Sequence, residues 1–248
     1  MIEILETIDS TNRVALEAIR EGYTHGDTWI SDEQTEGRGR RENGTRRSWF
    51  SPSGDNIYMS VALNLKTAPH QISPITIVVG TIVCEQFRKL GSSCWLKWPN
   101  DIYVGSRKLG GILTEAVTLD GQIAGVAVGI GLNINVAPED FPEELAERAQ
   151  SLRGELGMPI DRLSLALAIR REVVAASDTF SVSNLSTFMP RIAACDGLNQ
   201  RSVMANIDGV WTKAIGDGIG DDGALRVILD GASTTVVAGE IRLLQEAE

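Results

Sequence analysis

Residues 112–131 read ILTEAVTLDGQIAGVAVGIG and decide the fold of this 248-residue chain. Two strand-like runs, 112–119 and 123–131, flank Asp120-Gly121, a pair that is typical of the tight turn in a β-hairpin. Another strand-like run, 94–98, comes shortly before them. The sequence therefore predicts adjacent antiparallel strands at the centre of the molecule.

Helical patterns stand on both sides of these strands. Polar residues around Ser10 can cap a first helix, and Gly22 can end it. Ser73-Pro74 suits the N-cap and first position of a second helix, and Asp161 can cap a later one. Apolar residues recur at three- and four-residue spacings after each signal, which together with the strands indicates an α+β fold. The expected helices cover about 11–21, 75–90, 142–153 and 163–180.

The pattern changes after residue 198. Val203, Ala205 and Ile207 alternate with other residues, and later apolar runs are separated by Asp-Gly pairs at 208–209, 222–223 and 230–231. Several short strands with such turns predict a small β-barrel of about fifty residues. We therefore predict two domains, residues 1–198 and residues 199–248.

Composition narrows the class of protein. The chain carries 33 acidic against 23 basic residues and a net charge of -10, which disfavours general nucleic-acid binding because that needs a basic surface. An ordinary acidic surface and a salt-adapted one both fit this balance. The N-terminus lacks a basic signal segment, and the longest apolar stretch, 72–83, is interrupted by polar residues and proline. We therefore expect no membrane contact and a cytoplasmic location.

The cysteines do not suggest a metal centre. Cys84, Cys94 and Cys195 are odd in number and form no CxxC pair, and the chain has only two histidines, His25 and His70. No transition-metal spacing results, so we predict buried thiols and assign no metal ligands.

A first basic segment reads GRGRR at residues 37–41. Gly37 and Gly39 allow the backbone to approach a ligand closely, while Arg38, Arg40 and Arg41 supply forked donors for phosphate or carboxylate oxygens. Like charges without an apolar anchor predict a loop that is mobile when empty and folds over an anionic ligand, with Arg38 helping to hold it closed. A solvated basic loop or a nucleic-acid arm remains the alternative.

A second segment combines KWPND at 97–101 with RKLGG at 107–111. Proline ends the strand, so Asn100 and Asp101 should emerge at its carboxyl end, with Lys97 on the rim of a pocket. Asp101 is a suitable partner to hold the Lys108 ammonium towards a phosphate. The two glycines at 110–111 let a ligand lie against the strand. The alternative is a hairpin with surface charges.

Six motifs in one order resemble the biotin protein ligase family almost end to end. They are DSTN at 9–12, Gln34 with GRGR at 37–40, WFSP at 49–52 with NIY at 56–58, KWPND at 97–101, KLGGI at 108–112 and GIGLN at 129–133. The resemblance implies a catalytic domain related in fold to class II aminoacyl-tRNA synthetases, followed by an SH3-like barrel. Members of the family can carry an N-terminal DNA-binding domain, but this chain begins directly on the catalytic motifs, so we expect the form without one.

The resemblance further implies a reaction in two halves. Biotin and ATP, the latter with Mg²⁺ on its phosphates, give biotinyl-5′-AMP and pyrophosphate. A lysine of a biotin carboxyl carrier protein domain then accepts the biotinyl group. Positioning and charge neutralisation can supply most of the acceleration of the first step, because a carboxylate is already a nucleophile at neutral pH.

Matching the motifs residue by residue implies the following roles. Catalytic roles fall to Lys108, Arg38, Arg40 and Asp101. Biotin contacts fall to Ser10, Thr11, Asn12, Gln34, Gly37, Arg38, Gly39, Arg40, Lys108, Gly110, Gly111, Gly129 and Gly131. ATP contacts fall to Arg40, Arg41, Trp49, Lys97, Asn100, Lys108 and Asn133.

One departure and two alternatives accompany the resemblance. Residues 42–45 lengthen the stretch between Arg41 and Trp49 by about four residues relative to the family pattern, so either Arg46 or Arg47 can take the next basic position. A lipoate or other acyl-carrier ligase would share fold and chemistry. A nucleic-acid-binding module would instead use the arginine loop on phosphates. Monomer and homodimer both remain open.

Overall fold

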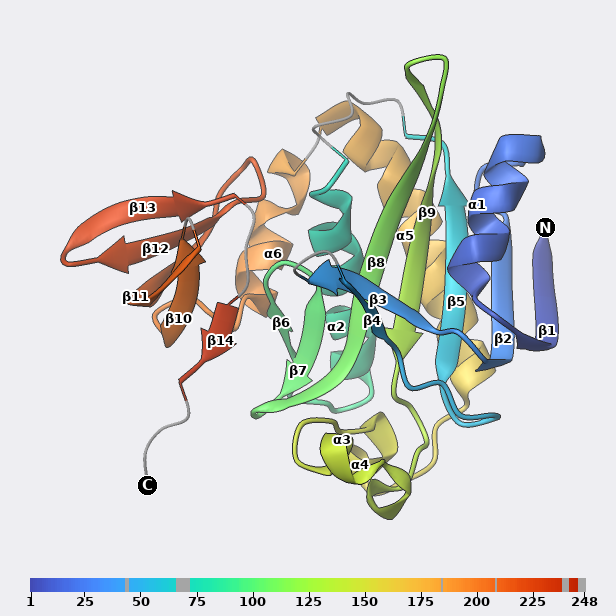
Figure 1. The fold of residues 1–248 in the computed structure, drawn as a ribbon, viewed down its shortest axis with the longest axis horizontal. Coiled ribbons are helices and arrows are strands. Elements are labelled where there is room, and N and C mark those ends of the chain that lie inside the picture. The colour runs from blue at the N-terminus through green and yellow to red at the C-terminus, as the bar shows by residue number, and fades with distance from the viewer. Residues whose placement is uncertain (43–44, 66–71, 184, 208, 238–240, 245–248) are drawn as a thin grey trace.

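The computed structural model describes residues 1–42, 45–65, 72–183, 185–207, 209–237 and 241–244 (Figure 1). Among these residues, seven strands form one mixed sheet, in which the first two neighbours are parallel and the others antiparallel. In sheet order the strands are β1 (Ile2–Ile8), β2 (Thr28–Gln34), β5 (Ile57–Leu63), β9 (Gln122–Leu132), β8 (Arg107–Leu119), β7 (Asp101–Val104) and β6 (Trp95–Lys97).

The central hairpin is the one that the sequence predicts. Asp120 and Gly121 connect β8 to β9 with φ of 50° and 78°, as a two-residue turn between twisted strands requires. β8 begins earlier than the apolar pattern suggested, at Arg107. The extension brings Lys108 and the following glycines into the sheet.

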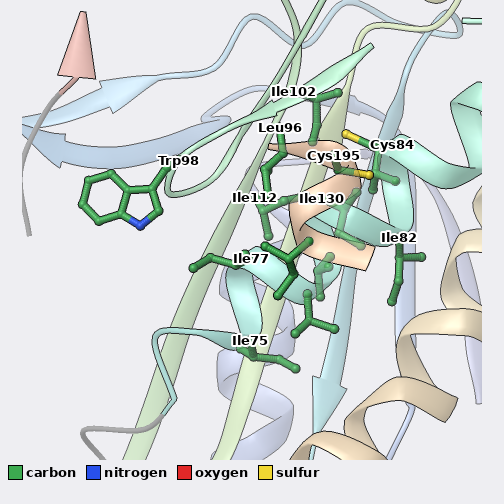
Figure 2. Close-up of a cluster of buried hydrophobic side chains, with 14 of the residues drawn as sticks. Ile75, Ile77, Ile82, Cys84, Leu96, Trp98, Ile102, Ile112, Ile130 and Cys195 are labelled. Carbon is green, nitrogen blue, oxygen red and sulfur yellow. The ribbon is translucent and has the colours of Figure 1, made fainter. Parts of the chain in front are cut away.

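Helices cover both faces of this sheet (Figure 1). On one face, Ala15 and Ile19 of α1 (Thr11–Glu21) pack with Trp29 and Ala127 of the sheet. On the other, α2 (Ile75–Lys89) and α5 (Arg162–Ser183) enclose the main core, and Figure 2 shows Ile82 of α2 in this cluster. Among the described residues, no helix is both long and apolar enough to cross a membrane.

Helix starts differ in detail from the capping patterns. Asp161 does cap α5, because its Oδ1 accepts from the Ser164 N–H at 3.1 Å. Ser10 occupies the N-cap position of α1 but makes no side-chain cap hydrogen bond. Pro74, rather than Ser73, is the N-cap residue of α2. The sheet, α5 and α6 (Met189–Cys195) all contact α2, so it is buried almost all round.

The predicted helix over 142–153 is wrong. The structure forms two short helices instead, α3 (Glu143–Ala146) and α4 (Leu152–Leu156). Between them, the chain extends along the start of β8, where the Lys108 N–H donates to Arg148 O at 2.8 Å and the Gln150 N–H to Lys108 O at 2.9 Å. This pairing overrides the local helical pattern and fixes the backbone of Lys108.

The three cysteines are free and buried, as predicted. Cys84 lies on α2 and Cys195 ends α6, and Figure 2 shows both beside the aliphatic side chains of the main core. Among the described residues, no group of three or more His, Cys, Asp or Glu side chains could hold a metal ion.

The C-terminal residues form a small antiparallel sheet, which confirms the short strands predicted after residue 198. Its described strands, in sheet order, are β13 (Ala232–Val236), β12 (Leu225–Leu229), β11 (Val210–Ile219), β10 (Ser202–Ile207) and β14 (Ile241–Leu243). Its apolar side chains join the main core, and the Trp98 indole N–H donates to Gly223 O at 2.8 Å. The small sheet therefore contacts the turn that follows β6.

Trp98→Phe tests this connection. Phenylalanine keeps most of the buried ring but removes the donor, so the Gly223 carbonyl loses its partner in a buried position. We expect a loss of about 1 to 3 kcal/mol in the free energy of unfolding. Thermal melting measures it, with Trp211→Phe on β11 as the matched control. Equal melting temperatures for both variants and the parent protein would contradict the prediction.

Candidate active site

A row of residues crosses four strands on the face that carries α1. Gly131 pairs with Gly111, Gly111 with Asp101, and Asp101 with Lys97. Residues paired in register point to the same face of a sheet, so the row places a carboxylate and an ammonium beside two residues without side chains. A second row, one step along the strands, contains Ser60, Gly129 and Leu113.

Gly111, Gly129 and Gly131 form a glycine strip on this face. A Cβ atom at Gly129 would lie 2.7 Å from Asn12 Oδ1, and one at Gly131 would lie 2.9 Å from Trp49 Nε1. One at Gly111 would lie 3.3 Å from Lys108 Nζ. Polar groups therefore surround bare backbone, as in sites where a ligand lies against a strand. Gly110 differs, because it alternates with Gly111 along β8 and its Cβ position lies 2.5 Å from the apolar side chain of Leu132.

A buried hydrogen-bond network stands at the α1 end of the strip. Gln34 Oε1 accepts from the Thr11 N–H at 2.8 Å and from its hydroxyl at 3.2 Å. The Ser60 hydroxyl lies 2.8 Å from Thr11 Oγ1 and 3.1 Å from Asn12 Oδ1. Asn12 Nδ2 donates to Glu115 Oε2 at 2.6 Å. The neighbouring Ser10 is almost fully buried.

Sequence reasoning missed two members of this network, Ser60 and Glu115. Ser60 lies on β5, whose seven residues are all buried, so a hydroxyl in an otherwise apolar strand was the available signal. Glu115 gave no such signal, because single charged residues are common on half-exposed strands. Only the register of β8 against β9 and α1 brings it to the network.

The other end of the strip is cationic. Lys108 Nζ donates to Asp101 Oδ1 at 2.6 Å, which confirms the predicted pair, and lies 5.3 Å from the centre of the Trp49 ring. The Lys97 ammonium lies 5.0 Å from the Tyr103 ring centre. Asn133, predicted to contact a nucleotide, donates through Nδ2 to Lys108 O at 3.4 Å and so supports this lysine.

The predicted arginine loop is a β-hairpin. β3 (Arg38–Glu42) pairs with β4 (Thr45–Ser48), and Figure 1 shows the hairpin crossing in front of β8 and β9. Backbone pairing supplies the anchor that the polar sequence does not reveal. Arg40 Nη1 donates to Asn100 Oδ1 at 3.0 Å, so this contact ties the hairpin to the sheet. The side chain of Arg41 falls outside what the structure describes.

Smaller contacts close the hairpin's base. The Trp49 N–H donates to Gly37 O at 2.9 Å, and the two strands pass closely at Gly39, where a Cβ would lie only 3.3 Å from Arg47 O. Arg38 stands near Asp9: the hydrogen bond from Arg13 chiefly lowers the pKa of that carboxyl, and the Arg38 charge adds to the effect. The site thus has a cationic cover on an acidic protein.

A cavity of about 290 Å³ opens beside β8. Its walls include Arg40 and Asn100 together with Ile112, Thr114 and Thr76. Trp49 covers the strip itself, and its Nε1 is buried without a hydrogen-bond partner among the described residues. A ligand on the strip would therefore have to meet or displace the indole.

Gly129→Ala tests the glycine strip. The added methyl group would lie 2.7 Å from Asn12 Oδ1, well inside contact distance, so either the network or the ligand must shift. We expect ligand affinity at this end to fall by roughly tenfold, comparable to the loss of one hydrogen bond. Calorimetric titration measures it, and thermal melting of the same variant shows whether the fold is kept. Unchanged affinity would contradict the role of the bare strand.

The fold and the candidate site describe an α+β protein whose mixed sheet carries a strip of glycines, with a buried hydrogen-bond network at one end and a lysine ammonium at the other. The chain belongs to the biotin/lipoate A/B protein ligase family, whose model matches residues 4–133. Its resemblance to biotin protein ligases is confirmed by individual relatives.

Three of those relatives cover nearly all of this chain. The bifunctional ligase/repressor BirA of Escherichia coli is 35% identical over 243 residues, covering 98% of this chain and 74% of that protein. The biotin--[acetyl-CoA-carboxylase] ligase of Paracoccus denitrificans is 30% identical, covering 90% and 92%. The structure of the Aquifex aeolicus biotin protein ligase in complex with biotin and ATP matches with a TM-score of 0.80 and 25% identity, covering 97% of each chain.

Proposed function

We propose that this protein is an ATP-dependent biotin ligase that activates biotin as biotinyl-5′-AMP and transfers it to a lysine of a carrier protein. One observation carries the proposal: a hydrogen-bonding network and a held ammonium stand at opposite ends of one glycine strip. This arrangement suits a molecule with a polar ring at one end and a carboxylate at the other. The membership of the family agrees with it.

The chemistry needs little acid-base machinery. A biotin carboxylate oxygen attacks the α-phosphorus of ATP, the bond from that phosphorus to the bridging oxygen breaks, and pyrophosphate leaves with the Mg²⁺ that ATP brought. The carrier amine then attacks the acyl carbon, AMP leaves, and the amine loses a proton. Lys108 neutralises charge shared by the carboxylate and the phosphate, and Asp101 keeps it in place.

The remaining residues take positions consistent with this reaction. Thr11, Asn12 and Gln34 hold the ring of biotin, whose ureido group has two N–H donors and one acceptor. Arg40 and Asn100 line the cavity beside β8, which we assign to the nucleotide. Lys97 and Arg38 add positive charge on this side, and the Trp49 indole lies over the strip. A reactive mixed anhydride gains from such a cover, because it excludes water.

We also propose the finer description of the fold. Residues 1–198 form a catalytic domain related to class II aminoacyl-tRNA synthetases, and residues 199–248 an SH3-like barrel. The five-stranded antiparallel order of the small sheet supports the second part. The hydrogen bond from Trp98 to Gly223 O shows that the two parts are in contact at the turn that follows β6. Asn100, which we assign to the nucleotide site, lies in the same turn.

A pyrophosphate exchange assay tests the function. With ATP and labelled pyrophosphate, we expect exchange that depends on biotin, and none with lipoate in its place. Exchange with lipoate but not biotin would favour the other branch of the family. Exchange with neither, together with a shifted band on DNA at low salt, would favour a nucleic-acid-binding module instead.

A further inference from the structure

Glu115 lies on β8 beneath the start of α1, where its Oε2 accepts from Asn12 Nδ2 at 2.6 Å. We propose that Glu115 is a positioning residue that fixes the direction of hydrogen bonding in the Asn12–Ser60–Thr11 network, so that the network offers acceptors to the N–H donors of a cyclic urea. The inference rests on the proposed function and adds a determinant of substrate choice to it. Glu115 does not itself need to touch the substrate.

The first step concerns the orientation of the Asn12 amide. A carboxylate only accepts hydrogen bonds, whereas an amide has a donor end and an acceptor end. Glu115 therefore draws the Asn12 NH₂ group towards itself, because the opposite orientation would set two acceptors against each other. Asn12 Oδ1 must then point to the other side, where the Ser60 hydroxyl lies at 3.1 Å.

The second step follows the remaining donors. The Thr11 hydroxyl donates to Gln34 Oε1 at 3.2 Å, Gln34 Nε2 donates to Ser51 Oγ at 3.3 Å, and the Ser51 hydroxyl donates to Trp49 O at 3.0 Å. These donors are directed to protein acceptors. Lone pairs on Asn12 Oδ1 and the Ser60 hydroxyl therefore remain at the strip, where Asn12 Oδ1 lies directly over the bare backbone of Gly129.

The third step is selectivity. A cyclic urea brings N–H groups that satisfy buried acceptors, whereas a dithiolane ring brings none. Buried acceptors without partners cost free energy, and sites built on such hydrogen bonds reject analogues that lack them strongly. With Glu115 in place, the network thus favours biotin over lipoate. Without its direction fixed, the Asn12 amide can turn and offer a donor instead.

Glu115→Gln is the central test, because glutamine keeps the size of the side chain but can donate as well as accept. In biotin-dependent pyrophosphate exchange we expect the KM for biotin to rise about ten- to a hundredfold, the range for a hydrogen bond to a charged group. The KM for ATP, kcat and the melting temperature should stay near those of the parent protein. Glu21→Gln, at the exposed far end of α1, is the matched control.

A double variant separates polarity from structure. Asn12→Asp alone sets two carboxylates together and should also raise the KM for biotin. Combined with Glu115→Gln, the new amide can donate to the new carboxylate, whose second oxygen faces Ser60 as an acceptor. We expect this pair to recover most of the lost affinity.

Three outcomes would overturn the inference: an unchanged KM for biotin in Glu115→Gln, a double variant no better than either single one, or equal rises in both substrates' KM with lower melting. Pyrophosphate exchange by the unmodified protein distinguishes a failure of this inference from a failure of the proposed function. If it fails to exchange pyrophosphate with biotin at all, the function itself is wrong. If it exchanges normally and Glu115→Gln does too, only the positioning role is wrong.

Discussion

Lys108→Ala should slow biotin-dependent pyrophosphate release by about 30- to 1,000-fold, which corresponds to roughly 2 to 4 kcal/mol of barrier. The Lys108 ammonium is held 2.6 Å from Asp101 and beside the strip, so its charge is already in place when the carboxylate and phosphate meet. A group fixed in advance stabilises the transition state without reorganisation. Quenched-flow measurement of pyrophosphate, at saturating biotin and ATP, gives the rate.

The two half-reactions provide the internal control. When synthetic biotinyl-5′-AMP is supplied, Lys108→Ala should transfer the biotinyl group to a carrier domain at a rate much closer to that of the parent protein. Lys213→Ala, an exposed lysine on β11, should leave both rates unchanged. A normal rate of pyrophosphate release in Lys108→Ala would show that another group carries the charge neutralisation.

Asp101→Asn tests the residue that positions the Lys108 ammonium rather than the ammonium itself. An amide keeps the size of the side chain but not its charge, so Lys108 loses the partner that fixes it. The rate should fall less than in Lys108→Ala, because the ammonium itself remains. A larger fall would mean that Asp101 acts directly on a reactant.

Local patterns predicted the elements that depend on local forces. The Asp120-Gly121 turn and the Asp161 cap both follow from the conformations that these residues prefer, and the structure contains both. The pattern over 142–153 failed because Lys108 pairs with that segment through the backbone, an interaction between residues about forty apart in the sequence. The spacing of apolar residues shows which face of a segment is apolar. It does not show which of its backbone groups will hydrogen-bond to a strand that is distant in the sequence.

The residues of the candidate site likewise fall into those that the sequence motifs predicted and those that only the tertiary structure brings together. Motif order assigned Lys108, Asp101 and Asn12 to one site, and the register of β7, β8 and β9 brings them to one face. Glu115 and Ser60 could not be assigned, since their proximity to Asn12 depends on how α1 lies on the sheet. Gly110 shows the reverse: motif position groups it with Gly111, but alternation along β8 turns it towards Leu132.

Arg40→Ala should release the adenylate. In the structure, Arg40 Nη1 donates to Asn100 Oδ1 at 3.0 Å and so joins the β3–β4 hairpin to the turn after β6. Sequence reasoning gave the closing role to Arg38, but this spanning contact comes from Arg40. Losing one charge-assisted hydrogen bond at a partly exposed position should raise the rate of adenylate escape about five- to thirtyfold. Escaped biotinyl-5′-AMP acylates lysines without selection.

Two measurements follow the released adenylate. Rapid filtration with labelled biotin gives the escape rate directly, and biotinylation of an unrelated lysine-rich protein reports the loss of selectivity. Asn100→Ala removes the other half of the same contact and also the bond from Asn100 Nδ2 to Ile112 O at 3.1 Å, so it should raise the escape rate at least as much. Adding Arg40→Ala to Asn100→Ala should then have little further effect, because the Arg40–Asn100 bond is already broken. Arg20→Ala, exposed at the end of α1, controls for loss of a positive charge. If Arg40→Ala retains its adenylate and labels only the carrier, other contacts hold the hairpin closed and the Arg40–Asn100 hydrogen bond is not needed for this.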